Sequence, residues 1–192
     1  MKVLGIVCSP RKGGNTEIMV EEALAAAREG GAETELVLVA GKTIAPCDAC
    51  ESCRKTGVCH IKDDMQPIFQ QLQAADGVIF GTPVYFGNVS AQAKAIMDRT
   101  HAFSGDRRLR GKVAGPIVVT RRLGAVQTRN LLYSYFITQR MIVVAAGIGY
   151  GREKGDVRQG VGGAPGSSAL EEARVVGTSV VQMVRQLSKP KN

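Results

Sequence analysis

Short apolar runs alternate with longer amphipathic stretches along most of the chain. The apolar runs are bounded by Gly, Pro or charged residues and predict five strands, at residues 2–7, 34–38, 77–81, 113–120 and 141–146. Apolar side chains at helical spacing predict five helices, at residues 15–29, 63–74, 90–100, 124–139 and 168–187. Strands that alternate with helices in this way are typical of an α/β fold, in which a parallel sheet is covered on both faces.

Two segments interrupt this alternation. The first carries most of the cysteines and spans about residues 45–62, and the second is the Gly-rich stretch 147–166, which we expect to be either a mobile flap or partly disordered. The sequence has 192 residues, of which 44% are hydrophobic, so it is long enough for one core and too short to favour two. We therefore predict a single domain over residues 1–188, with an insertion at about 45–62 and a short tail at 189–192.

The loop after the first predicted strand has the residue types of a phosphate site. It occupies residues 8–16 and leads directly into a helix, whose first N–H groups have no partner within the helix and attract anions. Hydroxyls, an amide, a glycine and two cations make up the candidate phosphate ligands, namely Ser9, Arg11, Lys12, Gly14, Asn15 and Thr16. The Walker and dinucleotide-binding glycine motifs are both absent here, and an ordinary capped turn is the alternative interpretation.

A second loop is predicted to lie beside the first. In a doubly wound sheet ordered 2-1-3-4-5 the first and third strands are neighbours, so the loops that follow them face one crevice. The loop after residues 77–81 offers aromatic faces and backbone amides for a flavin ring, and its candidates are Pro83, Val84, Tyr85, Phe86, Gly87 and Asn88. Thr120 and Arg121 should border the same crevice, where a cation would stabilise a reduced flavin anion. The alternative is that these residues only shape a turn and fill the core.

Four of the five cysteines lie close together in the sequence, at Cys47, Cys50, Cys53 and Cys59. Spacings of this kind can wrap one iron–sulfur cubane, because short loops aim successive sulfurs at adjacent corners. The alternatives are uncoordinated thiols, a disulfide, or a zinc site, although zinc ligands more often fall into two separated pairs. Cys8 lacks the arginine six positions later that a cysteine phosphatase loop needs, so we expect it to be a packed residue.

Several stretches resemble a known family. The motifs SPR and GNT within residues 9–16, TPVY at 82–85 and KAIMDR at 94–99 are similar to those of the NADPH-dependent FMN reductase family, and the similarity spans about residues 1–150. The resemblance implies a flavodoxin-like fold, FMN as cofactor, and homodimers or homotetramers in which a neighbouring subunit helps to build each flavin site. The compact cysteine spacing resembles the iron–sulfur flavoproteins, which implies a [4Fe-4S] cluster on the four cysteines and electron exchange with an acidic ferredoxin.

Charge and composition narrow the range of partners. Lys and Arg total 25 against 17 acidic residues, so the formal charge is +8, which suits anionic cofactors or an acidic protein partner. With five Phe, four Tyr, no Trp and scattered arginine pairs, the sequence does not predict nucleic-acid binding. It has neither the longer apolar stretch and cleavage site of a signal peptide nor a run of about 18 apolar residues, so we expect a cytoplasmic protein that does not enter the membrane.

These features together predict an FMN-dependent oxidoreductase. In this hypothesis the flavin exchanges two electrons with one partner and single electrons with the cluster, and NAD(P)H is a further candidate co-substrate. The first alternative is a cluster-free NAD(P)H-dependent reductase of flavins, quinones, azo compounds or metal ions. The second is a non-catalytic FMN electron carrier. No general acid or base is predicted, because the flavin itself carries the chemistry.

Overall fold

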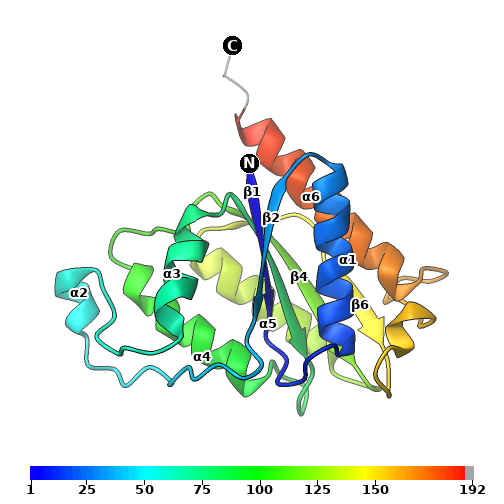
Figure 1. Ribbon diagram of the computed structural model, residues 1–192, viewed down its shortest axis with the longest axis horizontal. Coiled ribbons are helices and arrows are strands. Elements are labelled where there is room, and N and C mark those ends of the chain that lie inside the picture. The colour runs from blue at the N-terminus through cyan, green and yellow to red at the C-terminus, as the bar shows by residue number, and fades with distance from the viewer. Residues whose placement is uncertain (189–192) are drawn as a thin grey trace.

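The computed structural model describes residues 1–188, and the predicted tail at 189–192 lies outside them. A parallel sheet of order β2-β1-β3-β4-β5 forms the centre of the molecule (Figure 1). Its four longer strands are β1 (Lys2–Val7), β2 (Glu33–Leu38), β3 (Gly77–Pro83) and β4 (Val113–Thr120). This order confirms the predicted doubly wound α/β fold. It also brings the ends of β1 and β3 together, because Val7 pairs with Gly81.

The fifth predicted strand is divided into two short ones. β5 (Ile142–Val143) pairs with the start of β4, and β6 (Gly147–Tyr150) pairs with the end of β4. The prediction of one strand over residues 141–146 is therefore wrong in extent, and the Gly-rich segment begins as a strand rather than as a flap. Glycine has a packing role here, since a Cβ on Gly149 would overlap the sulfur of Met19.

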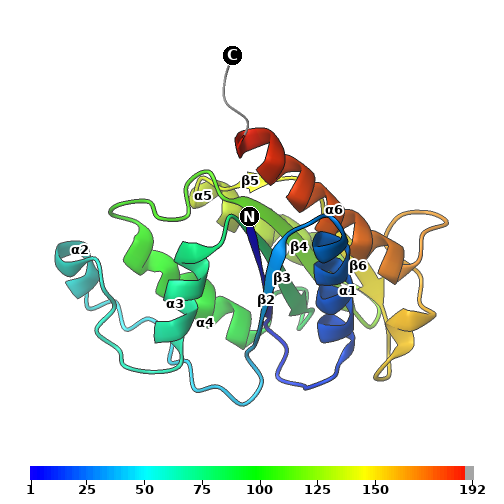
Figure 2. The ribbon, with the colours of Figure 1, turned by 45° about the horizontal axis from the view of Figure 1, so that its top comes forward.

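Helices cover both faces of the sheet. α1 (Asn15–Glu29) and α6 (Ala169–Ser188) lie side by side on one face (Figures 1 and 2). α3 (Met65–Ala74), α4 (Ala91–Arg99) and α5 (Ala125–Thr138) cover the other face, and two 3-10 helices, η1 (Thr100–Phe103) and η2 (Asp156–Arg158), follow α4 and β6. Every predicted helix is thus present, with ends shifted by one or two residues. None of the helices in residues 1–188 is long and apolar enough to cross a membrane.

Alternating residues of the central strands supply two separate apolar cores. Val3 and Ile79 belong to the core under α1 and α6, together with Val180 of α6. Leu4 and Phe80, their neighbours in sequence, belong to the core under α3, α4 and α5. All these side chains are almost completely buried. α1 and the cysteine segment are therefore supported by different layers of the molecule.

The cysteine segment projects from the sheet between β2 and α3, on the side of α3 and α4 (Figures 1 and 2). It contains one short helix, α2 (Ser52–Thr56), which the sequence pattern did not predict. Two of its residues, Cys53 and Cys59, pack against the core under α3, α4 and α5. The segment is thus attached to the protein body rather than detached from it.

Candidate functional site

A crevice of about 560 Å³ lies at the carboxyl edge of the sheet, where β1 and β3 end. Loops that follow β1, β3 and β4 contribute to it. The predicted cofactor-binding residues that line it are Ser9, Arg11, Lys12, Gly14, Asn15, Thr16, Pro83, Val84, Tyr85, Thr120 and Arg121. The other three predicted residues, Phe86, Gly87 and Asn88, are not among its lining residues. The pairing of β1 with β3 thus brings most of the predicted set into one space.

The N-terminus of α1 opens toward this crevice. Its N-cap residue is Gly14, which has no side chain to bond the first N–H groups of the helix. The N–H of Gly13, just before it, donates to a carboxylate oxygen of Glu17 at 2.5 Å. The buried hydroxyl of Ser9 accepts a hydrogen bond from the N–H of Arg11 at 3.1 Å. The loop therefore already binds one anionic oxygen through its backbone, which is the property that a phosphate site requires.

The sequence pattern missed one side of the crevice, which the Gly-rich segment supplies. Gly151, Arg152, Glu153 and Lys154 line this side. Lys154 lies against the first loop: Gly13 has a φ of 62°, and a Cβ there would lie 2.7 Å from Lys154 Nζ. Charge could have indicated this side of the crevice in the sequence, because the basic residues Arg152 and Lys154 lie in a segment dominated by glycine.

Positive charge predominates around the crevice. Its lining contains one acidic side chain, that of Glu153, and five basic ones, those of Arg11, Lys12, Arg121, Arg152 and Lys154. Convergent cations in a concave site attract a dianion, and each hydrogen bond to a charged group contributes roughly 1.5–3 kcal/mol. The crevice therefore suits a phosphate ester.

The loop after β3 ends in a tight turn that stands beside the crevice rather than in it. The N–H of Tyr85 donates to the carbonyl of Asn88 at 2.9 Å, and the N–H of Asn88 donates back at 3.0 Å. Phe86 and Gly87 at the tip have φ angles of 51° and 74°, as a type I′ turn requires. Phe86 is fully exposed, and the side-chain oxygen of Asn88 accepts from the N–H of Val89 at 2.8 Å. The turn geometry thus explains why these three residues do not line the crevice.

Ser90 fixes the base of this loop. Its buried hydroxyl donates to the carbonyl of Cys8 at 2.6 Å and accepts from the N–H of Ala93 at 3.1 Å, so it joins β1 to β3 and also caps α4. Its own N–H donates to the hydroxyl of Thr82 at 3.1 Å. Ser90 thus bonds a first-turn N–H group of α4, whereas no side chain caps the first-turn N–H groups of α1. The N-terminus of α1 is therefore the one better suited to bind an anion. Burial raises the pKa of the Cys8 thiol well above its usual range, which agrees with a packed residue.

The four clustered cysteines line a second cavity, of about 380 Å³, and all are free thiols in the described residues 1–188. Ala49 and Glu51, on either side of Cys50, have left-handed φ angles of 57° and 59°. Such angles are uncommon for residues other than glycine. Burial, and then the charges of the other three cysteines, raise the pKa of Cys53. The four sulfurs therefore face one shared space and affect one another electrostatically.

A buried arginine holds this segment to the body of the protein. Arg99, at the end of α4, is 1% exposed and forms an ion pair with Asp63 at 2.7 Å. It also donates to the carbonyls of Ala45 and Ile61 and to the sulfur of Cys59. Burial tends to raise the pKa of Asp63, but hydrogen bonds from Arg99 and from two backbone amides outweigh it and hold that pKa below its ordinary value. Arg99 is not among the site residues predicted from the sequence.

A polar pair borders the cysteine cavity. His60 Nε2 lies 2.7 Å from a carboxylate oxygen of Asp48. Together with Cys50 they form the one group of His, Cys, Asp or Glu residues in positions 1–188 whose ligand atoms all lie within 4.8 Å of one another. The four cysteine sulfurs are thus more widely spaced than a single tetrahedral metal ion would place them, since Zn–S bonds of about 2.3 Å separate sulfurs by only about 3.8 Å.

A profile of the NADPH-dependent FMN reductases matches residues 1–153. The chain belongs to this family. An iron-sulfur flavoprotein of Methanocaldococcus jannaschii is 41% identical over 199 residues, which cover 98% of this chain and 100% of the relative. An iron-sulfur flavoprotein of Methanosarcina thermophila is 40% identical over 147 residues, which cover 75% of this chain and 77% of the relative.

Solved structures agree with the fold of this FMN reductase family member. A WrbA-like flavodoxin from Agrobacterium tumefaciens superposes with a TM-score of 0.65 at 22% identity, covering 96% of this chain and 97% of the other. Together with the family match, this similarity confirms the predicted flavodoxin-like fold. The protein is accordingly a flavin-dependent oxidoreductase.

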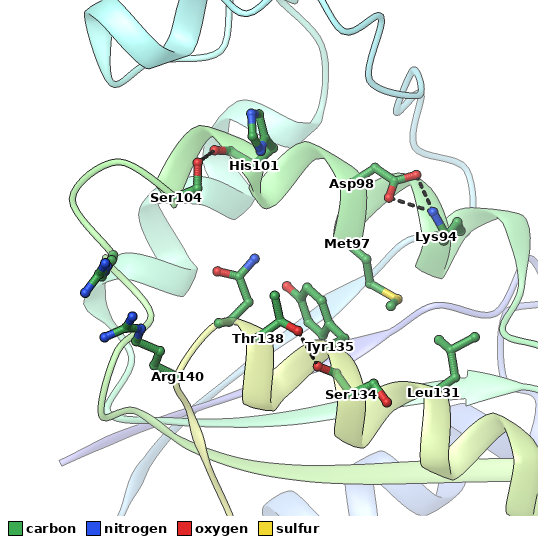
Figure 3. Close-up of a pocket in the computed structure, with 12 residues that line it drawn as sticks. Lys94, Met97, Asp98, His101, Ser104, Leu131, Ser134, Tyr135, Thr138 and Arg140 are labelled. Atoms are coloured by element: carbon green, nitrogen blue, oxygen red, sulfur yellow. Dashed lines mark hydrogen bonds and ion pairs between the residues drawn. The ribbon is translucent and has the colours of Figure 1, made fainter.

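A third cavity of this FMN reductase family member, of about 590 Å³, lies between α4 with η1 and α5 (Figure 3). Met97 and Tyr135 point into it in Figure 3, and Lys94 pairs with Asp98 at its edge at 2.6 Å. The hydroxyl of Tyr135 lies 3.0 Å from that of Thr100, and burial raises the Tyr135 pKa, so the phenol stays neutral. None of the predicted site residues lines this cavity.

Proposed function

We propose that this chain binds FMN in the crevice and exchanges electrons between that flavin and a [4Fe-4S] cluster held by Cys47, Cys50, Cys53 and Cys59. One observation carries the proposal: all four cysteines line a single cavity in a chain that is similar along its length to an iron-sulfur flavoprotein. A bound flavin supplies electron transfer in one- or two-electron steps, and a cluster supplies one-electron steps.

The FMN phosphate would be held by the loop after β1. Gly14 leaves the first turn of α1 free to donate, and Ser9 and Thr16 place hydroxyls beside it. Arg11 and Lys12 supply positive charge from the same loop, and the Gly-rich segment adds more from the other side. Pro83, Val84 and Tyr85 would then cover the ring, with Thr120 and Arg121 at its polar edge. Phe86, Gly87 and Asn88 would contact the ring only if their turn moved.

A cluster fits the cysteine cavity better than zinc does. No three of the four cysteine sulfurs in residues 1–188 all lie within 4.8 Å of one another, as zinc ligands would, whereas a cubane spreads its four ligands over separate corners. Burial, and then the charges of the other three cysteines, raise the pKa of Cys53, and a cationic metal group would stabilise its thiolate. Both relatives are iron-sulfur flavoproteins, which supports the same choice.

An acidic one-electron carrier such as ferredoxin would be the redox partner, because the chain has a net charge of +8. The alternative partner is NAD(P)H, in a reductase that works without a cluster. The NADPH dependence of the family favours this partner. The crevice favours it too, because it has more cations than one phosphate needs. Steady NAD(P)H oxidation by iron-free protein with added FMN or quinone would select this alternative.

A second copy of the chain would complete the flavin site in a homodimer or homotetramer. Phe86 is fully exposed, and Leu123 on the adjoining loop is 78% exposed. The two loops touch, because a Cβ on Gly124 would lie 2.8 Å from the Cα of Gly87. Exposed apolar residues gathered at the mouth of a crevice are typical of an interface.

The test is an anaerobic visible spectrum with assays of iron, acid-labile sulfide and extracted FMN. We expect about four irons and four sulfides per FMN in the wild type, and their loss with retention of FMN in Cys53→Ser. Cys8→Ala is the matched control, because Cys8 is the one cysteine outside the cavity, and it should keep its iron. If wild type that is purified anaerobically and reconstituted holds flavin but no iron, the cluster is excluded. If the protein has no affinity for flavin, both the FMN site and its electron exchange with a cluster are excluded.

A further inference from the structure

We infer that Arg99 positions the thiolate of Cys59 and raises the reduction potential of the group that the cysteines hold. This inference rests on the proposed function, because it concerns the ligand set of the cluster. Arg99 lines the cysteine cavity, and its Nε lies 3.2 Å from the sulfur of Cys59. The same side chain also forms hydrogen bonds with both ends of the cysteine segment.

The guanidinium joins the beginning and the end of that segment. Nη1 donates to the carbonyl of Ala45 at 2.9 Å, and Nη2 donates to the carbonyl of Ile61 at 3.3 Å. Both nitrogens also bond the carboxylate of Asp63, at 2.7 and 3.0 Å. With its two ends held on one rigid group, the segment can present its sulfurs in a fixed arrangement before any metal binds.

Only arginine can make this set of contacts. Its planar fork has five N–H donors in fixed directions, whereas a lysine has one nitrogen and three donors. The side chain of Arg99 is completely buried and that of Asp63 is 8% exposed, so neither charge is solvated if its partner is removed. A fully buried charge is costly unless it is paired, so removing either partner should be strongly destabilising.

The bond to Cys59 has a direct consequence for electron transfer. Reduction adds one electron and places more negative charge on the cysteine sulfurs, without making or breaking a covalent bond. An N–H donor from a permanently charged side chain stabilises that charge more in the reduced form than in the oxidised form. Hydrogen bonds to the sulfurs are one of the factors that set the potential of such clusters. The carboxylate of Asp63 moderates the effect because it neutralises the net charge of Arg99.

The test is a potentiometric titration of the reconstituted cluster, followed by electron paramagnetic resonance. Arg99→Lys retains a cation beside Asp63 and loses the Nε donor, so the midpoint potential should fall. A roughly threefold change in the reduction equilibrium is expected, which is about 30 mV at about 59 mV per tenfold for one electron. Arg174→Lys is the matched control: it makes the same replacement in an arginine of α6 that pairs with Glu22 and Glu29 on the other face of the sheet, and it should leave the potential unchanged.

A second variant is expected to shift the potential in the opposite direction, which a fold defect common to both variants would not do. Asp63→Asn keeps the donor to Cys59 and removes the balancing negative charge, so it should shift the potential upward. Each protein is compared at equal iron and FMN content. Unchanged potentials in Arg99→Lys or Asp63→Asn, with the cluster present, overturn the inference and leave the proposed function intact. A wild type that holds no iron after reconstitution overturns the proposed function and this inference together.

Discussion

The side-chain oxygen of Asn15 accepts a hydrogen bond from the backbone N–H of Gly155 at 2.7 Å, across 140 positions of sequence. The amide nitrogen of the same side chain donates to the carbonyl of Glu153 at 2.8 Å. Asn15 therefore uses its amide to hold the Gly-rich segment against the start of α1. By keeping Lys154 close to the loop after β1, it contributes to the proposed phosphate site indirectly as well as by lining the crevice.

Replacing Asn15 with Ala should release that segment. The two lost hydrogen bonds contribute about 0.5–1.5 kcal/mol each, so opening should increase by on the order of tenfold. Trypsin should cut faster after Arg152 and Lys154, and FMN affinity should fall in parallel. Cleavage rates followed by mass spectrometry and FMN titration would measure both effects. Asn130→Ala, at an exposed position of α5, is the control. Equal cleavage of the two variants would contradict the role of Asn15 in holding the Gly-rich segment.

Lys154→Gln should weaken FMN binding without weakening riboflavin binding. The lysine faces the loop that we assign to the phosphate, and a lost contact to a charged group of roughly 1.5 kcal/mol corresponds to about a tenfold change in Kd. Fluorescence titration with the two flavins measures the difference. Arg158→Gln removes an exposed cation from the same segment, outside the crevice lining, and should change neither Kd. Equal losses for both flavins would place Lys154 away from the phosphate.

Gly124→Ala should destabilise the protein and separate the two loops beside the crevice. Gly124 has a φ of 90°, and its new Cβ would lie 2.8 Å from the Cα of Gly87. Left-handed strain of this kind costs on the order of 1–3 kcal/mol, and each kcal/mol lowers Tm by about 2–4 °C in a chain of this size. Gly105→Ala is the matched control, because a Cβ there meets nothing within 4 Å. A Tm equal to that of the control would refute the close approach.

Asp63→Asn should destabilise the fold by an amount that depends on pH. Removing one partner of a buried ion pair costs about 3–5 kcal/mol. The folded pKa of Asp63 lies below its ordinary value, so its contribution is complete above about pH 4 and is lost as the pH falls through the folded pKa. The difference between wild type and variant in urea unfolding should thus be constant near neutrality and shrink only in acid.

Asp106 offers the comparison for that measurement. It pairs with Arg108 at 2.6 Å, but its side chain is 54% exposed, so Asp106→Asn should cost about 0–1 kcal/mol at any pH. If the two variants behaved alike, the Arg99–Asp63 pair would be solvated in solution rather than buried.

Phe86→Glu should shift the oligomer toward monomer. The side chain is fully exposed at the tip of its turn, so a charge there costs the isolated chain little and costs an apolar interface much. Light scattering measures the mass. Val175→Glu, on the exposed surface of α6, is the control and should leave the mass of the wild type. An unchanged mass for Phe86→Glu would move the proposed interface elsewhere.

The elements that the sequence predicts well are those whose burial is decided by near neighbours. The apolar runs 2–7 and 77–81 become adjacent strands, and the loops after them meet as the strand order requires. Local periodicity carries this information because a strand or helix buries a regular set of its own side chains. The position of the loop after β1 at the crevice was predictable for the same reason, since this loop joins two such elements directly.

Contacts between distant segments were not predictable in this way. The segment after β6 looks flexible because of its glycines, yet it lines the crevice through bonds to Asn15. Arg99 occupies the last turn of α4, where a basic residue ordinarily faces water, and only its distant partner Asp63 makes burial possible. Phe86 read as a ring-binding aromatic, but the φ angles of its turn direct it outward. Each outcome depends on a partner or a backbone angle that local hydrophobicity does not encode.

The division of the interior into two cores determines how damage to this molecule would spread. Val180 supports the layer of α1, whereas Phe69 supports the layer on which Cys53 and Cys59 pack. A substitution that opens a void under α3 and α4 should loosen the cysteine cavity more than the start of α1, since only the sheet is common to the two layers. If the proposed function holds, the cysteine segment and the loop after β1 can therefore change separately, and we expect a chain that lost its cysteines still to bind flavin.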